Sequence, residues 1–362
     1  MNIAPEKHYN LGFFNLARGL GMILILAGHS FVPFITPSIP TAASTLFSGA
    51  GSVIGAGVMA MFFMISGFGF YTRSAKKCIS TQNKLLLIPY LQVIFLLFLA
   101  RMGIALIRGR SLVTTAVDLL LTYPLGLNAE NSSALFGAPV KSVTILWFIL
   151  ALYGGWILYN GISRLKNVFV RRALVISSVI ASWVLTLIGK AWPLCLPMAM
   201  LACGYLAVGH TIKQRNLLAQ KIPFIAWIVM IGITAASCVF GFVDIGAGVW
   251  KMGLLDVLST FCIGIMLLRG YARFMHLSLR NPLIHTLERI GNRSIWILFL
   301  HAMEKTVLPW SRLSMLLPNS PLLCALLCLA IRGFLIWCAY KIFSRLHRYI
   351  RNNRKPKYRT NP

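Results

Sequence analysis

Long apolar runs separated by short polar connections are the dominant pattern of this chain. A helix needs about 20 apolar residues to cross the hydrocarbon core of a bilayer, and about ten segments meet that length. They run approximately over residues 13–35, 47–71, 85–107, 143–162, 173–189, 192–212, 224–243, 252–268, 295–313 and 321–343. The pattern therefore predicts an all-α, polytopic integral membrane protein with about ten transmembrane helices.

The composition excludes a soluble globular domain. Hydrophobic residues make up 58% of the chain, charged residues make up 12%, and the mean hydropathy is +0.76. A soluble domain carries about twice that share of charged residues. The first apolar segment is too long for the core of a signal peptide, so we expect it to remain as the first helix. We expect one transmembrane domain over residues 1–345, followed by a basic cytoplasmic tail over residues 346–362.

The distribution of the basic residues along the chain indicates whether they face lipid or nucleic acid. The net charge is +28, but the lysines and arginines concentrate in alternate connections, after the second, fourth, sixth and eighth segments, and in the tail. This asymmetry is the positive-inside pattern, which predicts that both termini lie in the cytoplasm. We therefore expect these residues to face the anionic lipid bilayer and expect no nucleic-acid partner. The eight cysteines include no CxxC pair, so we expect no metal site.

A polar stripe on the first segment is the first candidate for function. The stretch RGLGMILILAGHSF places His29 eleven residues after Arg18. Eleven residues at about 100° each make three turns plus about 20°, so both side chains share one face, about 16 Å apart along the axis. Asn15 joins the same face. Arg18 could reach the cytoplasmic interface and His29 could bond a neighbouring helix, but titratable residues inside a membrane are also functional candidates.

The ninth and tenth segments carry further polar residues. Ser294, His301 and Glu304 are spaced by seven and three residues and share a helix face. A carboxylate at position 304 could orient the imidazole, or it could simply mark the outer end of the span. Arg332 lies too deep to reach either interface and requires a partner, for which Glu304 and Asp256 have suitable depths. We favour a structural ion pair over a substrate contact for Arg332.

Several short motifs carry a resemblance to a known family, in order along nearly the whole chain. The motifs are NLARGLGMILILAGHS in the first segment, FFMISGFGF at 62–70, LWFILALY at 146–153, LPMAMLACGYL at 196–206 and IGNRSIWILFLH at 290–301. In these motifs the chain resembles the acyltransferase-3 family of multispanning membrane acyltransferases, whose first helix typically has an arginine and, eleven residues later, a histidine. Leu298 stands where the family's last motif has a tyrosine.

The resemblance implies transfer of an acyl group, most often acetyl from acetyl-CoA, to a hydroxyl of a glycan, a lipid-linked saccharide or a similar envelope molecule. It also implies a bacterial inner (plasma) membrane location. His29 would be the general base, because imidazole titrates near neutrality, or would form a covalent acyl-histidine. Ser30 and Ser66 are weaker candidates for a nucleophile. His301 and Trp147 become site candidates through the same resemblance.

Donor binding is the part of the resemblance in which this chain departs from the family. Basic residues of the first cytoplasmic connection would attract the coenzyme's phosphates, and Arg18 would be the innermost contact or would orient the thioester carbonyl. The candidates in that connection are Arg73, Lys76, Lys77 and Lys84. The acid that precedes the family's arginine is Asn15 here, and Asn83 and Leu86 replace an arginine pair before Pro89. If that pair normally holds the donor's phosphates, either donor binding is altered in this chain or the chain has lost the activity.

Two other classes of function remain open from the sequence. A membrane module that transports or senses a small polar solute would also place polar residues on apolar helices, although paired broken helices in inverted halves are absent from the pattern. A scaffolding membrane protein would explain the charge asymmetry but not the stripe from Arg18 to His29. Consumption of a thioester distinguishes the acyltransferase from both.

Overall fold

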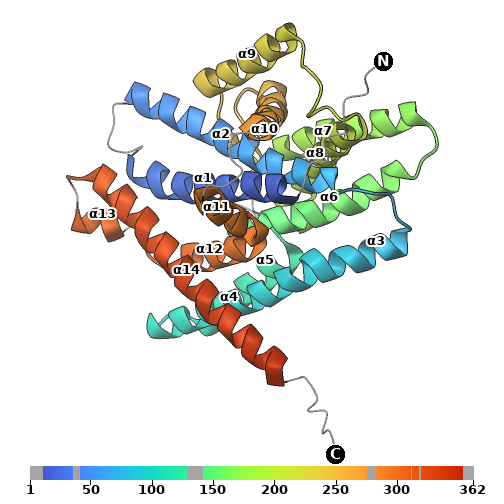
Figure 1. The fold of residues 1–362 in the computed structure, drawn as a ribbon. Coiled ribbons are helices and arrows are strands. Elements are labelled where there is room, and N and C mark those ends of the chain that lie inside the picture. The colour runs from blue at the N-terminus through green and yellow to red at the C-terminus, as the bar shows by residue number, and fades with distance from the viewer. Residues whose placement is uncertain are drawn as a thin grey trace, which may run out of the picture.

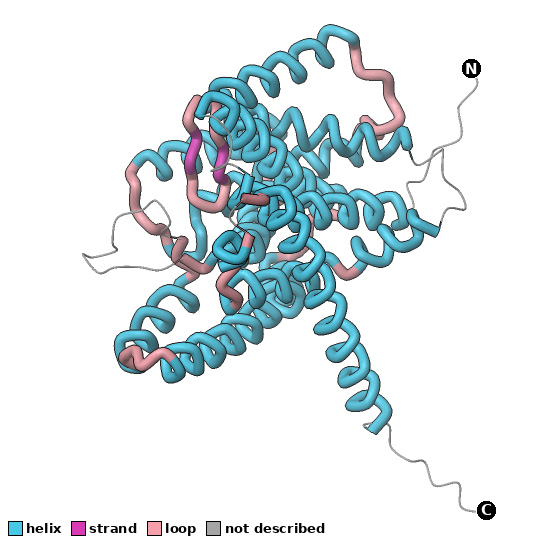
Figure 2. Tube along the Cα trace, turned by 90° about the vertical axis from the view of Figure 1, so that its left-hand side faces the viewer, coloured by secondary structure: helices cyan, strands magenta, loops and turns pink. Residues whose placement is uncertain are grey.

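The structure is a computed structural model that describes residues 11–35, 41–128, 142–274, 282–310, 312–317 and 319–353. Over these residues the chain is almost entirely helical (Figures 1 and 2), which confirms the predicted all-α polytopic membrane fold. The first half of the chain forms α1 (Leu11–Ile35), α2 (Thr41–Phe68), α3 (Ala75–Gln82), η2 (Asn83–Leu87), α4 (Ile88–Ile107), α5 (Leu112–Leu125), η3 (Thr144–Leu146), α6 (Trp147–Ser163) and α7 (Val168–Leu187). The second half forms η4 (Pro193–Cys195), α8 (Leu196–Gln214), α9 (Phe224–Phe240), β1 (Val243–Asp244), β2 (Val249–Trp250), α10 (Leu254–Phe274), α11 (Pro282–Asn292), α12 (Ser294–Val307), α13 (Arg312–Leu316) and α14 (Pro321–Asn353).

Within the described residues, 8 helical segments are long and apolar enough to cross a membrane. They correspond to the predicted segments except the seventh and the ninth. The seventh is α9, which has 17 residues, and the ninth is divided into α12, of 14 residues, and the short α13. The break has a local cause, because Pro309 disfavours a helical conformation at the preceding residue, and Leu308 is extended, with φ −90° and ψ 135°.

The third predicted segment begins earlier than expected. Helix α3, η2 and α4 form one apolar helical segment of 33 residues that starts at Ala75, where the Ser74 hydroxyl caps the backbone N–H of Lys77. The η2 part is a π-helix, in which the N–H of Ile88 bonds the carbonyl of Asn83. Pro89 has no N–H to continue the α-helical pattern at that point, so a local change of hydrogen-bond register accommodates it.

Helices α2, α6 and α8 form the inner part of the bundle. Of the 8 spanning segments, these three have the largest share of buried residues. Two motif glycines explain how closely the helices approach. A Cβ atom on Gly67 would fall onto the backbone of Leu206 in α8, and one on Gly291 of α11 would fall onto the carbonyl of Asn15 in α1. Small residues at such contacts let the backbones of membrane helices pack directly.

The bundle has two distinct ends. In Figure 1 the α2–α3 and α6–α7 connections lie at the right, whereas the α4–α5 connection and the start of α14 lie at the left. We call the right-hand end, which holds Arg73 and Arg164, the basic end, and the opposite end the outer end. Helix α14 continues to Asn353, so the predicted boundary at residue 345 falls inside one helix. Residues 354–362 of the predicted tail lie outside the described residues.

Candidate active site

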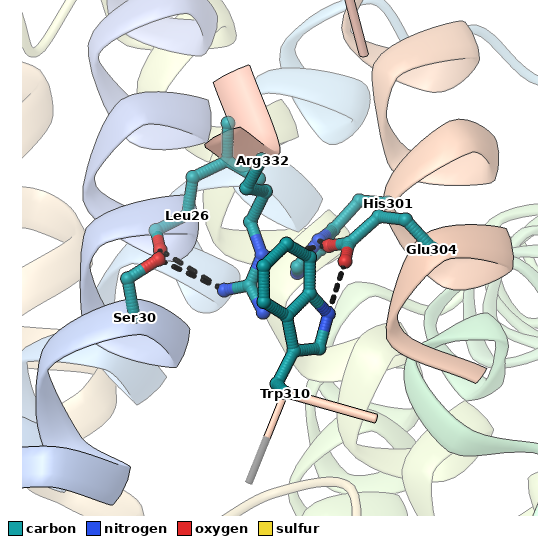
Figure 3. Close-up of polar contacts among 6 residues, drawn as sticks. All are labelled: Leu26, Ser30, His301, Glu304, Trp310 and Arg332. Carbon is teal, nitrogen blue, oxygen red and sulfur yellow. Dashed lines mark hydrogen bonds and ion pairs between the residues drawn. The ribbon is translucent and has the colours of Figure 1, made fainter. Parts of the chain in front are cut away.

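Glu304 is the centre of a buried polar cluster near the C-terminal end of α12 (Figure 3). Its Oε1 atom lies 2.5 Å from Nδ1 of His301 and 2.7 Å from Nε of Arg332. Its Oε2 atom accepts a hydrogen bond of 2.5 Å from Nε1 of Trp310. The carboxylate therefore holds three side chains, and only 8% of Glu304 is exposed to solvent. A buried charge needs such partners because desolvation strongly disfavours the isolated ion.

Arg332 joins this cluster to α1. Its guanidinium donates to the Ser30 hydroxyl at 2.9 Å and lies 3.5 Å from the carbonyl oxygen of Leu26. The side chain is 2% exposed, and its guanidinium carbon lies 4.9 Å from the ring centroid of Trp310. The predicted pairing with Glu304 is thus confirmed. The other candidate partner, Asp256, instead accepts hydrogen bonds from Ser237 and from the backbone N–H of Met252.

Two histidines from distant parts of the chain meet beside this cluster. The ring centroids of His29 on α1 and His301 on α12 are 5.1 Å apart, with an angle of 44° between the planes. His301 is fully buried, and its Nε2 atom has no hydrogen-bond partner within the described part of the chain. His29 is only partly buried. Because Nδ1 of His301 is taken up by Glu304, Nε2 is the ring nitrogen that is left for a further hydrogen bond.

A cavity of about 380 Å³ extends from the basic end toward the histidine pair. Arg18, Arg73, Gln82 and Ser66 contribute its polar lining. Its lining also includes Ile25 and Leu298, which precede His29 and His301 by four and three residues in the sequence. Those spacings correspond to about one helical turn, so the cavity approaches the two histidines along both helices.

The structure brings together only some of the predicted donor-binding residues. Arg18 lies 3.5 Å from the Asn15 side chain, and it lines the cavity with Arg73, whose guanidinium stacks 3.9 Å from the centroid of Tyr71. Lys76 and Lys84 instead border an open depression on the outside of α3 and η2, and Lys77 is exposed. Helix geometry separates them, because α3 turns these positions away from the bundle interior.

The structure also shows what surrounds Asn83 and Leu86, the two residues that stand where the family has an arginine pair. Leu86 is buried and lines the cavity, whereas the Asn83 side chain accepts a hydrogen bond of 2.8 Å from Tyr153. Arg73 precedes α3 and lines the same cavity. It therefore supplies a cation in the cavity to which Leu86 contributes only an apolar side chain. Its Nε atom is buried without a hydrogen-bond partner among the described residues.

The remaining predicted residues have clear structural surroundings. Ser66 accepts a hydrogen bond of 2.8 Å from Trp156, and Ser294, at the start of α12, lines the cavity. The Ser30 hydroxyl donates to the Leu26 carbonyl while it accepts from Arg332, so it is fully engaged. Trp147 packs against Phe63 and Phe148 and is not among the residues that line the cavity.

Sequence reasoning missed Trp310, Gln82 and Trp156. Trp310 follows Pro309, and that proline was the available signal that the chain turns back toward Glu304. Gln82 is 3% exposed and lines the cavity, but a single amide at the end of a short amphipathic stretch gives no pattern. Trp156 lies on an apolar helix, where an aromatic residue usually indicates packing.

The fold and the cluster together define a multi-pass membrane protein that holds a buried carboxylate–histidine pair, with a cavity that reaches to about one helical turn from it. Comparison with protein families identifies it further: the chain belongs to the acyltransferase-3 family, whose acyltransferase domain matches residues 11–339. The match covers nearly the whole chain and makes the protein a membrane acyltransferase. No curated protein and no solved structure matches the chain significantly.

Proposed function

We propose that this protein transfers an acyl group, most simply acetyl, from acyl-CoA to a hydroxyl of a cell-envelope glycan or lipid-linked saccharide in a bacterial inner membrane. The observation that carries the proposal is the meeting of His29, His301 and Glu304 about one helical turn beyond a cavity that is lined by two arginines. Acyl transfer needs a base beside the acceptor hydroxyl and cations beside the donor, and the cavity runs from the two arginines toward the histidines.

His29 is the general base in this proposal. It is the more exposed member of the pair, and we therefore assign it to the acceptor, whereas His301 is fully buried. The acceptor oxygen attacks the thioester carbonyl carbon while His29 takes the hydroxyl proton. The carbon–sulfur bond then breaks, and the protonated imidazole returns the proton to the departing coenzyme thiolate. The products are the acyl ester and the free thiol.

His301 and Glu304 are positioning residues. The carboxylate fixes the imidazole of His301 through Nδ1, as the acid of a hydrolase triad fixes its histidine. His301 in turn lies against the face of His29 and provides a polar neighbour when that ring becomes positively charged. Arg332 and Trp310 hold Glu304 in place from two further directions.

The donor enters from the basic end. Arg18 and Arg73 are the two cations that line the cavity, and both can bind phosphate oxygens through paired N–H groups. Seven residues separate Arg18 from Ile25, or about 10 Å along α1, which an extended thioester arm can follow. The lysines at positions 76, 77 and 84 lie outside the cavity, where they raise the local concentration of an anionic donor.

The test is release of free thiol from acetyl-CoA by the purified protein in nanodiscs, with a mixture of oligosaccharide acceptors. We expect acceptor-dependent release by the parent and a loss of at least 100-fold in His29→Ala, within the usual contribution of a general base. His285→Ala is the matched control, because His285 is exposed on α11, lies 3.5 Å from Glu288 and does not line the cavity.

Two outcomes would contradict the proposal. Full activity in His29→Ala would remove this residue from the chemical step. Absence of both thiol release and acetyl-CoA binding in the parent, under conditions in which the protein remains folded, would favour the alternative of a transport or sensing module. Uptake of small polar solutes into proteoliposomes would then be the next measurement.

A further inference from the structure

A second, larger cavity lies away from the histidine pair, between α7, α8 and α10. Its volume is about 950 Å³, near the upper limit of typical small-molecule sites. It is lined by the α7 face at Arg171, Val175 and Val179, and by the α10 face at Leu258, Phe261 and Ile265. None of the residues that carry the proposed acyl transfer belongs to it.

One end of this cleft is strongly basic. Five cations line it, from α7, from the end of α8 with the following connection, and from α10: Arg171, Arg172, Arg215, Lys221 and Arg269. The sequence contains no acidic residue between Glu130 and Asp244, and none of the lining residues is acidic. The Nε atom of Arg171 is buried without a hydrogen-bond partner among the described residues. The cleft therefore presents a concentrated positive charge, and no carboxylate among its described lining residues offsets it.

The rest of the cleft is a long apolar wall. The lining residues of α10 recur at helical spacing from Leu254 to Arg269, which corresponds to about 22 Å along the axis. This exceeds half of the bilayer's hydrocarbon thickness of about 30 Å, so the wall is as deep as one lipid leaflet. Helix α7 is the least buried spanning segment, and its lining residues Ile176 and Ile180 are largely exposed. The cleft thus opens toward the surrounding lipid.

We propose that this cleft binds an anionic glycerophospholipid, with its phosphate among Arg171, Arg215 and Lys221 and its acyl chains between α7 and α10. The cations at one end of the cleft match the lipid's phosphate, and the apolar wall, which is as deep as one leaflet, matches its acyl chains. A free phosphate or a nucleotide would satisfy only the basic end and would leave the apolar wall uncovered. The orientation also fits the sequence, which assigns the basic end to the cytoplasmic leaflet.

The experiment measures lipid binding to the delipidated full chain in detergent, by native mass spectrometry and by thermal shift. Phosphatidylglycerol is compared with phosphatidylcholine of the same acyl chains, and with inorganic phosphate and free coenzyme A. We expect phosphatidylglycerol to bind at least tenfold more tightly than phosphatidylcholine and to raise the melting temperature. In Arg171→Ala/Arg215→Ala we expect that preference to be lost.

The matched control is Arg164→Ala/Lys166→Ala, which removes two exposed charges at the same end of the bundle but outside the cleft. It should keep the preference. Arg171→Lys/Arg215→Lys should keep most of it, and Ile180→Trp, which narrows the apolar wall, should weaken binding of the lipid but not of inorganic phosphate. Equal binding of the two lipids, equal behaviour of the alanine and control variants, or displacement of phosphatidylglycerol by coenzyme A at this cleft would each overturn the proposal.

Discussion

The buried pair of Glu304 and Arg332 allows a quantitative test of the cluster. In Glu304→Gln the side chain keeps its shape and can still accept from Trp310, but Arg332, only 2% exposed, loses its counter-charge. Removing one partner of a buried pair costs about 3–5 kcal/mol. Because Arg332 keeps Ser30 and the Leu26 carbonyl as acceptors, we expect the lower value, about 3 kcal/mol.

The assay is a double-mutant cycle on melting temperature in one detergent. At roughly 2 °C per kcal/mol for a long chain, Glu304→Gln should lower the melting temperature by about 6 °C. Arg332→Met should lower it similarly, because it leaves the carboxylate buried without its cation. The double variant has neither charge, so we expect it to recover at least half of the summed loss, although its acyltransferase activity should stay low.

The reasoning fails if the two losses simply add in the double variant, because the side chains would then not be energetically coupled. Glu288→Gln is the control. Glu288 and His285 form a solvent-accessible pair at 3.5 Å. Such pairs contribute less than about 1 kcal/mol, so this variant should have the same melting temperature as the parent.

Three further predictions concern the donor cavity, the support of Glu304 and the helix packing. Arg73→Ala should raise KM for acetyl-CoA about tenfold or more with a smaller change in kcat, but it should not change KM for S-acetyl-pantetheine, which lacks the nucleotide phosphates. Trp310→Phe removes the hydrogen bond to the Glu304 carboxylate and should lower kcat about tenfold, while an unchanged kcat would show that Trp310 only packs. Gly291→Val would place its side chain on the Asn15 carbonyl and should destabilise the protein by at least ~1–3 kcal/mol, measured as melting temperature, and parent-like melting would contradict the close packing of α1 and α11.

The fold could be predicted from the sequence to a large extent, because bilayer thickness sets the length of each apolar run. The polar stripe of Arg18 and His29 also followed from helical periodicity alone. The depth of Arg332 along its segment indicated Glu304 and Asp256 as candidate partners, and the structure shows that the partner is Glu304. Each of these inferences needs either the periodicity of a single helix or the depth of a residue in the membrane, and both can be obtained from the sequence.

The remaining features depend on which helices are neighbours, and periodicity does not contain that information. The contact between His29 and His301 joins residues 272 positions apart in the sequence and exists only because α12 packs beside α1. Likewise, charge counting grouped Arg73 with Lys76, Lys77 and Lys84, whereas only Arg73 enters the cavity with Arg18. Pro309 was a signal that the ninth segment divides at Leu308. The run of apolar residues continues on both sides of that proline, however, so hydropathy alone predicted one span.

The early end of α12 determines how far an acceptor must travel. Its 14 residues extend about 21 Å, roughly two thirds of the hydrocarbon thickness, and His301 lies only six residues, or about 9 Å, before that end. For the polysaccharide acceptor that we propose, only the modified hydroxyl then has to enter the protein, and the polymer need not dissolve in the lipid. In the proposed reaction the thioester arm covers the longer part of the distance across the membrane, so we expect the length of the sugar polymer to have little effect on kcat.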